Sequence, residues 1–136
     1  MKLLMIYADR FAYRTTIKTL EEFEDREEER TEKDVLVGFI HVEKEDEEKL
    51  DKVETKLVKN LKWAAKKNNT NTIVLHSFAH LSESKGDPKI TKALLDRAEA
   101  RLINAGYEAW QTPFGYFLDL DMKAPGRSLA RVFKEF

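Results

Sequence analysis

The sequence predicts an α/β domain in which two main helices pack on one layer of mixed β-sheet. Short apolar runs rich in branched and aromatic residues occur near both ends of the chain and once in its middle. Between them lie two longer stretches in which apolar residues recur every three or four positions, as in amphipathic helices. With 136 residues the chain has the size of one compact domain, which we expect to span residues 1–136.

The first part of the chain predicts three strands. Residues 2–8 form a continuous apolar run, which is typical of a buried strand, and residues 11–20 alternate loosely between apolar and polar side chains. The charge-dense residues 21–33 favour a solvated loop or an exposed short helix over a binding arm. Residues 34–43 are again largely apolar and predict the third strand.

Two helices with a strand between them follow. The first helix is expected over residues 47–68, where the apolar residues share one face: Leu50, Val53, Leu57, Leu61 and Ala64. A short strand is expected at 72–75. Asp87 and Pro88 then indicate the N-cap and first position of the second helix, and Gly106 indicates its end.

The end of the chain predicts strands at 107–112 and 114–122, a turn at 123–127 and a short terminal helix at 128–136.

Composition excludes several classes of function. The formal net charge is only −1, so the domain as a whole is not a strongly basic nucleic-acid binder. The absence of cysteine excludes disulfides and a cysteine nucleophile, and without a long apolar run we expect a cytoplasmic protein with no membrane partner.

The histidines give one candidate site residue. His76 and His80 lie four residues apart, which in an extended chain is about 13 Å, too far for one shared metal ion. We therefore expect no metal site. His80 follows Phe78-Ala79 at the carboxyl end of a strand, where α/β sheets bind ligands. It is either a packed or capping histidine or a contact to substrate.

Residues 112–117, with the sequence Thr-Pro-Phe-Gly-Tyr-Phe, are the second unusual feature. They form either a turn packed by core aromatic residues or an aromatic platform with exposed amides, suited to a nucleobase. Four basic residues near the end of the chain are either an ordinary charged surface or a contact to phosphates: Lys123, Arg127, Arg131 and Lys134.

Three segments taken together resemble one known family. They are residues 37–44 (Val-Gly-Phe-Ile-His-Val-Glu-Lys), residues 77–82 (Ser-Phe-Ala-His-Leu-Ser) and residues 113–116 (Pro-Phe-Gly-Tyr). With their spacing, they resemble the N-terminal editing domain of archaeal threonyl-tRNA synthetase over nearly the whole chain. That family shares the fold of the D-aminoacyl-tRNA deacylases, so the resemblance implies a deacylase-like fold.

The resemblance implies proofreading: hydrolysis of the ester that joins L-serine to the terminal adenosine of tRNA(Thr), and of D-aminoacyl esters too. Serine and threonine differ by one methyl group, so a synthetic site can discriminate between them by only about 1–3 kcal/mol of binding free energy. A second pocket then removes the serine that has been attached in error. The expected partners are the 3′-terminal aminoacyl-adenosine of tRNA(Thr), a second copy in a homodimer and a synthetase core in a longer chain. No cofactor is expected.

The resemblance also implies roles for particular residues. The backbone of Val42, Glu43 and Lys44 would hold the adenine. The aminoacyl pocket would be lined by main-chain groups of Ser77, Phe78 and Ala79, and its facing wall would be formed by Phe114, Gly115 and Tyr116. His80 and Phe117 would lie beside the reacting ester, as the catalytic positions. The ribose 2′-hydroxyl of the substrate would help to activate the attacking water.

The chain departs from the family pattern at three positions. Phe117-Leu118 stands where relatives carry Tyr-Lys, Arg131 where they carry a glutamate, and Ser77 where a proline is expected. Two alternatives to an editing esterase therefore remain. One is a non-catalytic module that binds the tRNA 3′-end, and the other is a stand-alone D-aminoacyl-tRNA deacylase.

Overall fold

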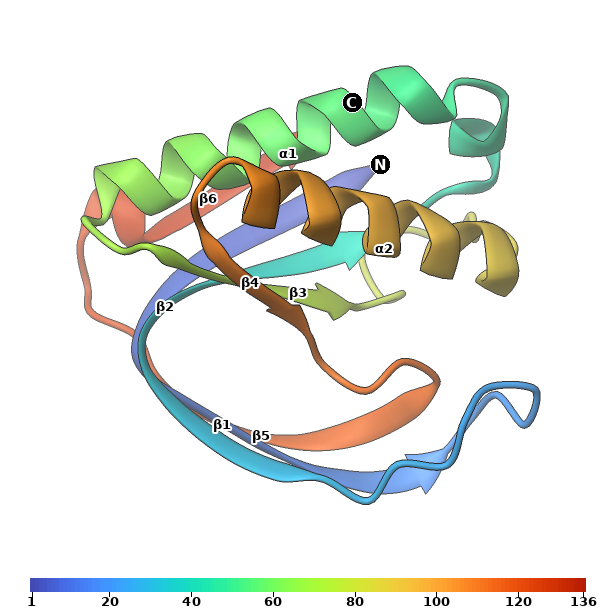
Figure 1. Ribbon diagram of the computed structural model, residues 1–136, viewed down its shortest axis with the longest axis horizontal. Helices are drawn as coiled ribbons and strands as arrows, with labels where there is room; N and C mark the ends of the chain where they lie inside the picture. Colours follow the sequence, from blue (N-terminus) through green and yellow to red (C-terminus); the bar gives the residue numbers. More distant parts are fainter.

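The computed structural model describes residues 1–136 and confirms the predicted α/β class: two helices lie on one face of a curled six-stranded sheet (Figure 1). The helices are α1 (Leu50–Lys67) and α2 (Pro88–Asn104). The strands are β1 (Lys2–Lys18), β2 (Glu29–His41), β3 (Thr72–Ser77), β4 (Glu108–Gln111), β5 (Tyr116–Lys123) and β6 (Arg131–Glu135). Two 3₁₀ helices occupy Lys44–Glu48 and Ser128–Ala130. Neither α-helix combines the length and apolar character needed to cross a bilayer.

The order of the strands brings the ends of β2 and β3 to one edge of the sheet. The order is β4-β3-β2-β1-β5, with β2, β3 and β4 parallel and β1 antiparallel to its neighbours. Because β1 is long, β6 pairs with its first half and β5 with its second half. β2 ends at His41 and its parallel neighbour β3 ends at Ser77, so the loops that follow the two strands start next to each other. Ligands usually bind at the carboxyl ends of such parallel strands.

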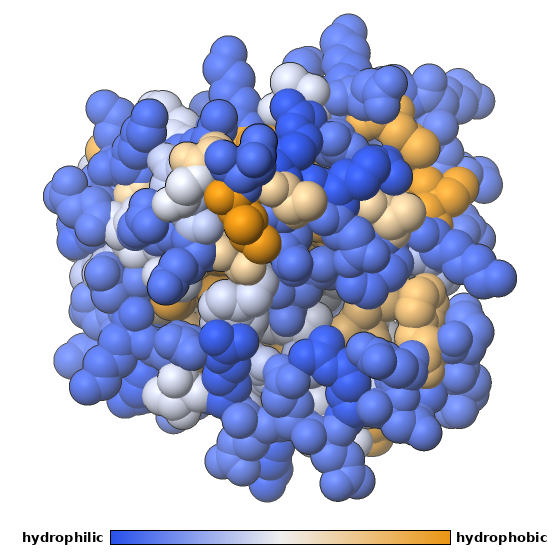
Figure 2. Space-filling model, in the orientation of Figure 1, coloured by the Kyte–Doolittle hydropathy of each residue, from blue (hydrophilic) through white to orange (hydrophobic).

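The main core lies between the sheet and the two helices. Leu57, Leu61 and Leu94 are fully buried there, and Gly38 lets α1 approach β2, since a Cβ at this position would lie 2.8 Å from Leu61 Cδ2. A smaller apolar cluster, which includes Phe11, fills the hollow of the curled sheet on its other face. Figure 2 shows that hydrophilic residues dominate the face in view, with hydrophobic residues in small separate groups.

The predicted break between strands 2–8 and 11–20 was wrong, because β1 is continuous. The strand bends instead: Asp34, opposite Asp9, has a left-handed backbone (φ 57°), and the Asp9–Asp34 pair is missing from the ladder. Tyr7 Oη and Thr70 Oγ1 each donate to Asp34 at 2.6 Å and hold this conformation. The loop predicted at 21–33 is shorter than expected, because residues 29–33 extend β2 along β1.

The predicted terminal helix at 128–136 was also wrong. Residues 131–135 form β6, because β5 covers only the second half of β1 and leaves an open edge beside Lys2–Ile6. The first helix begins at Leu50 rather than at residue 47, after a 3₁₀ turn. The start of α2 is confirmed: the Asp87 side chain accepts from the amides of Lys89 and Ile90, and Pro88 is its first residue.

Candidate functional site

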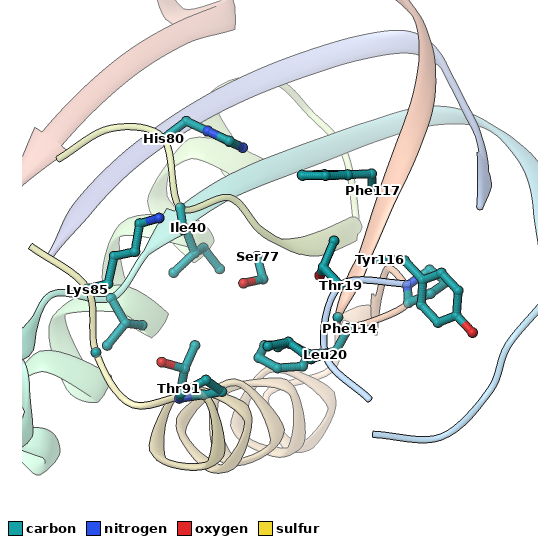
Figure 3. Close-up of a pocket in the computed structure, with 16 residues that line it drawn as sticks. Thr19, Leu20, Ile40, Ser77, His80, Lys85, Thr91, Phe114, Tyr116 and Phe117 are labelled. Atoms are coloured by element: carbon teal, nitrogen blue, oxygen red, sulfur yellow. The ribbon is translucent and has the colours of Figure 1, made fainter. Parts of the chain in front are cut away.

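A cavity of about 320 Å³ opens where β2 and β3 end and β5 begins (Figure 3). This volume is at the lower end of the range for small-molecule sites. Five segments form its walls: Thr19 and Leu20 after β1; Ile40 and Val42 at the end of β2; Ser77, Ala79 and His80 at the end of β3; Lys85, Gly86, Pro88 and Thr91 just before and at the start of α2; and residues 113–117.

The cavity brings the segments of the resemblance together. Ala79 and Phe114 line the same space, and the ring of His80 points across the mouth toward Phe117 (Figure 3). The sequence-predicted residues that line it are Val42, Ser77, Ala79, His80, Phe114, Gly115, Tyr116 and Phe117. Glu43, Lys44 and Phe78 do not line it.

The loop that carries His80 is held against β2 by His41. This buried ring accepts from the Leu81 amide through Nδ1 (3.0 Å) and donates from Nε2 to the Ser84 carbonyl (2.6 Å), which sets its tautomer. The Gly86 amide then donates to the Val42 carbonyl at 2.9 Å. A Cβ on Gly86 would lie 3.0 Å from Val42 Cγ1, so a residue without a side chain suits this close approach.

The buried side chain of Glu43 holds the same loop by a hydrogen bond. Its buried carboxylate accepts from Ser82 Oγ (2.7 Å) and Lys2 Nζ (3.1 Å) and pairs with the amino group of Met1 (3.0 Å). Burial alone would raise the pKa of Glu43, but these three donors hold it at about 2. The Glu43 amide donates to Asp46 (2.8 Å), and the Lys44 amide donates to Ser84 Oγ (3.0 Å), so both amides are already used.

The two later histidines have different environments. His76 is buried, contacts Thr112 Oγ1 through Nδ1 (2.8 Å), and lies edge-on to Phe39. Burial lowers the pKa of His76 to about 4, so its ring is neutral at pH 7. Phe78 packs near both His76 and His80, with ring centroids 5.8 and 4.8 Å away. His80 itself is exposed at the cavity mouth, and it is therefore the histidine that substrate can reach.

Residues 112–117 form a turn that has one aromatic residue packed in the core and another exposed at the cavity mouth. Phe114 is a core residue, 8% exposed and edge-on to Phe23, whereas Phe117 is 54% exposed at the mouth. Gly115 has φ 81°, and its carbonyl accepts from the Thr19 and Leu20 amides (2.6 and 3.3 Å). These bonds join the turn before β5 to the end of β1.

Unpaired backbone donors occur on both sides of the cavity. The amides of Ala79, His80, Phe114 and Gly115 donate no hydrogen bond within the protein. No carboxylate lines the cavity. Amides of this kind can bind a carbonyl oxygen and stabilise the negative charge that develops when water attacks an ester.

Sequence reasoning missed part of the site. Thr19, Leu20, Lys85, Gly86 and Thr91 carry no motif, and only the crossing of β1, α2 and β5 places them at the cavity. Leu118 and the four basic residues near the end of the chain lie elsewhere. Leu118 packs on the cluster in the hollow of the sheet, and none of Lys123, Arg127, Arg131 and Lys134 lines the cavity.

Comparison with known proteins identifies the family of the chain. The whole chain, residues 1–136, matches the family described as the archaea-specific editing domain of threonyl-tRNA synthetase. Curated relatives named threonine--tRNA ligase include those of Methanosphaera stadtmanae (34% identical over 134 residues), Thermococcus sibiricus (32%) and Thermococcus kodakarensis (33%). In each case the match covers 97% of this chain, and the chain spans 22% of the relative's length.

A solved structure supports the fold independently of sequence. The c-Myc DNA Unwinding Element Binding Protein superposes with a TM-score of 0.72 at 11% identity, over 100% of this chain and 99% of that one. At this identity the likeness shows the fold alone, and it confirms the predicted deacylase-like architecture. The match over all 136 residues shows that this chain belongs to the archaea-specific editing domain family of threonyl-tRNA synthetase.

Proposed function

We propose that the cavity hydrolyses the ester between L-serine and the 3′-terminal adenosine of tRNA(Thr), and D-aminoacyl esters as well. The observation that carries this proposal is the pairing of two turns with unused amides, at Ala79-His80 and Phe114-Gly115, around one cavity without a carboxylate. Such a site supplies hydrogen-bond donors to the ester oxygen on which negative charge develops.

The reaction needs little acid–base chemistry from the protein. Water adds to the ester carbon while backbone amides bind the carbonyl oxygen, and the bond from that carbon to the ribose oxygen then breaks. The proton released by the water passes to the departing ribose oxygen, with the neighbouring ribose hydroxyl orienting the water. His80 and Phe117, on opposite sides of the mouth (Figure 3), position the ribose and the ester.

Serine specificity is the first test. Seryl-tRNA(Thr) is expected to be hydrolysed about 10- to 100-fold faster than threonyl-tRNA(Thr), because a pocket that fits serine has to exclude the extra methyl group of threonine. Deacylation of the two radiolabelled esters measures this ratio, with buffer as the background. Equal rates at the background level would remove the proposal.

Replacing His80 is the second test. His80→Ala is expected to slow seryl-ester hydrolysis by about 10- to 100-fold, because a positioning side chain is lost while the backbone donors remain. The melting temperature should change little, since the His80 side chain is exposed and the contact that it loses is the one with the Phe78 ring. Single-turnover rates and the Kd of an uncleavable analogue separate the effects. Complete loss of turnover at normal affinity would instead identify His80 as a general base.

Leu118 favours one alternative. It stands where the family pattern has a lysine, and it packs on the smaller apolar cluster rather than at the cavity. The alternative is a domain that binds the tRNA end without cleaving the ester. Binding of an uncleavable seryl-adenosine without turnover of the ester would establish this module. A D-ester rate well above the L-seryl rate would instead indicate a stand-alone D-aminoacyl-tRNA deacylase.

The proposed partners follow from the same function. They are the aminoacyl end of tRNA(Thr), the rest of a synthetase in which this chain would be the N-terminal editing domain, and a second copy of the chain, all in the cytoplasm. Light scattering tests the second copy, and a single monomer mass would exclude it.

A further inference from the structure

The cavity contains one lysine that nothing within the protein neutralises. Lys85 is exposed and lines the wall opposite Tyr116 and Phe117, with its amine extended toward His80 (Figure 3). It takes part in no salt bridge and no side-chain hydrogen bond, in contrast to Lys2, Lys18, Lys44 and Lys92, which each have a carboxylate partner. Its neighbours Glu83 and Asp87 form no ion pair with it, and Asp87 caps α2.

The backbone of Lys85 is also fixed on both sides. The Ser84 carbonyl is bound by His41 Nε2 at 2.6 Å, and Ser84 Oγ accepts from the Lys44 amide at 3.0 Å. On the other side the Gly86 amide donates to the Val42 carbonyl at 2.9 Å. The amine therefore extends from an anchored segment into a cavity that has no carboxylate of its own.

We propose that Lys85 is a positioning residue that binds the phosphate on the 5′ side of the terminal adenosine. This inference rests on the proposed function, because it assumes an aminoacyl-adenosine in the cavity. The phosphodiester is the anion of such a substrate that lies nearest the ester, and an ammonium group binds phosphate as a point charge. Holding it would fix the nucleotide relative to His80 and the unpaired amides.

The test uses a seryl-adenosine in which an amide replaces the ester, with and without a 5′-phosphate. The wild-type domain is expected to bind the phosphorylated form roughly five-fold more tightly, and the advantage should shrink as salt rises. Lys85→Met should bind both forms equally, and Lys85→Arg should restore the advantage. Lys89→Met is the matched control, since Lys89 is an exposed lysine four residues later, in the first turn of α2, and does not line the cavity.

Isothermal titration calorimetry gives each Kd, and a melting curve checks the fold of each variant. A wild-type domain that binds both forms with equal affinity would overturn the role of Lys85 and leave the proposed function standing. So would a Lys85→Met variant that keeps the phosphate advantage. Failure of the wild-type domain to bind either form would remove the proposed function, and the role of Lys85 with it.

Discussion

Gly115→Ala is expected to slow ester hydrolysis by about 100-fold while the protein stays folded. Gly115 has φ 81°, which costs an L side chain about 1–2 kcal/mol. Its new Cβ would also lie 3.1 Å from the Cβ of Leu20. To relieve this contact, the turn must move away from Thr19 and Leu20, and both segments are walls of the cavity.

Two other glycines allow the effect of a positive φ to be separated from the effect of the contact with Leu20. Gly106 has φ 95° with nothing within 4 Å of its Cβ position, so Gly106→Ala should lose about 1–2 kcal/mol of stability and keep full activity. Gly126 has no positive φ, and nothing lies within 4 Å of its Cβ position, so Gly126→Ala should change neither stability nor activity. Urea denaturation and single-turnover deacylation give both quantities. Full activity of Gly115→Ala would show that the position of this turn does not control the reaction.

Glu43→Gln is expected to lower the free energy of unfolding at pH 7 by about 2–3 kcal/mol. The variant leaves Lys2 and the Met1 amino group without the Glu43 charge. Removing one member of a buried ion pair typically costs 3–5 kcal/mol, and Asp46, 3.0 Å from the same amino group, keeps the loss below that range. Because Ser82 also loses its charged acceptor, the loop that carries His80 should become more mobile.

The pH dependence of stability tests the same ion cluster. The fold lowers the pKa of Glu43 from its ordinary 4.5 to about 2, so the folded state binds fewer protons than the unfolded state in that range. The stabilisation is therefore complete above pH 4.5 and is lost as the pH falls toward 2. Urea denaturation of Glu43→Gln should show a weaker decline over this window. Glu45→Gln, an exposed neighbour outside the ion pairs, should behave as wild type, and an unchanged decline in Glu43→Gln would contradict this role for Glu43.

Caps and the spacing of apolar residues predicted α1, α2 and the central strands well. They failed for segments whose secondary structure depends on pairing with a strand far away in the sequence. Asp87, Pro88 and Gly106 act on their own helix, so the bounds of α2 were close to those predicted. Residues 131–135 become a strand only because the first half of β1 has a free edge. Four of the residues 29–33 are charged, but the segment extends β2 because β1 continues beside it.

The sequence by itself determined the α/β class, the family and the two motif segments around His80 and Gly115, because periodicity, caps and short motifs are local properties of a chain. Only the tertiary structure decided which residues share the cavity. It placed Lys85 and Thr91 at the cavity, and it directed Glu43 to the Met1 amino group rather than to the cavity. The physical reason is that strand pairing and burial depend on residues far apart in the chain, and no local pattern records which of them will meet.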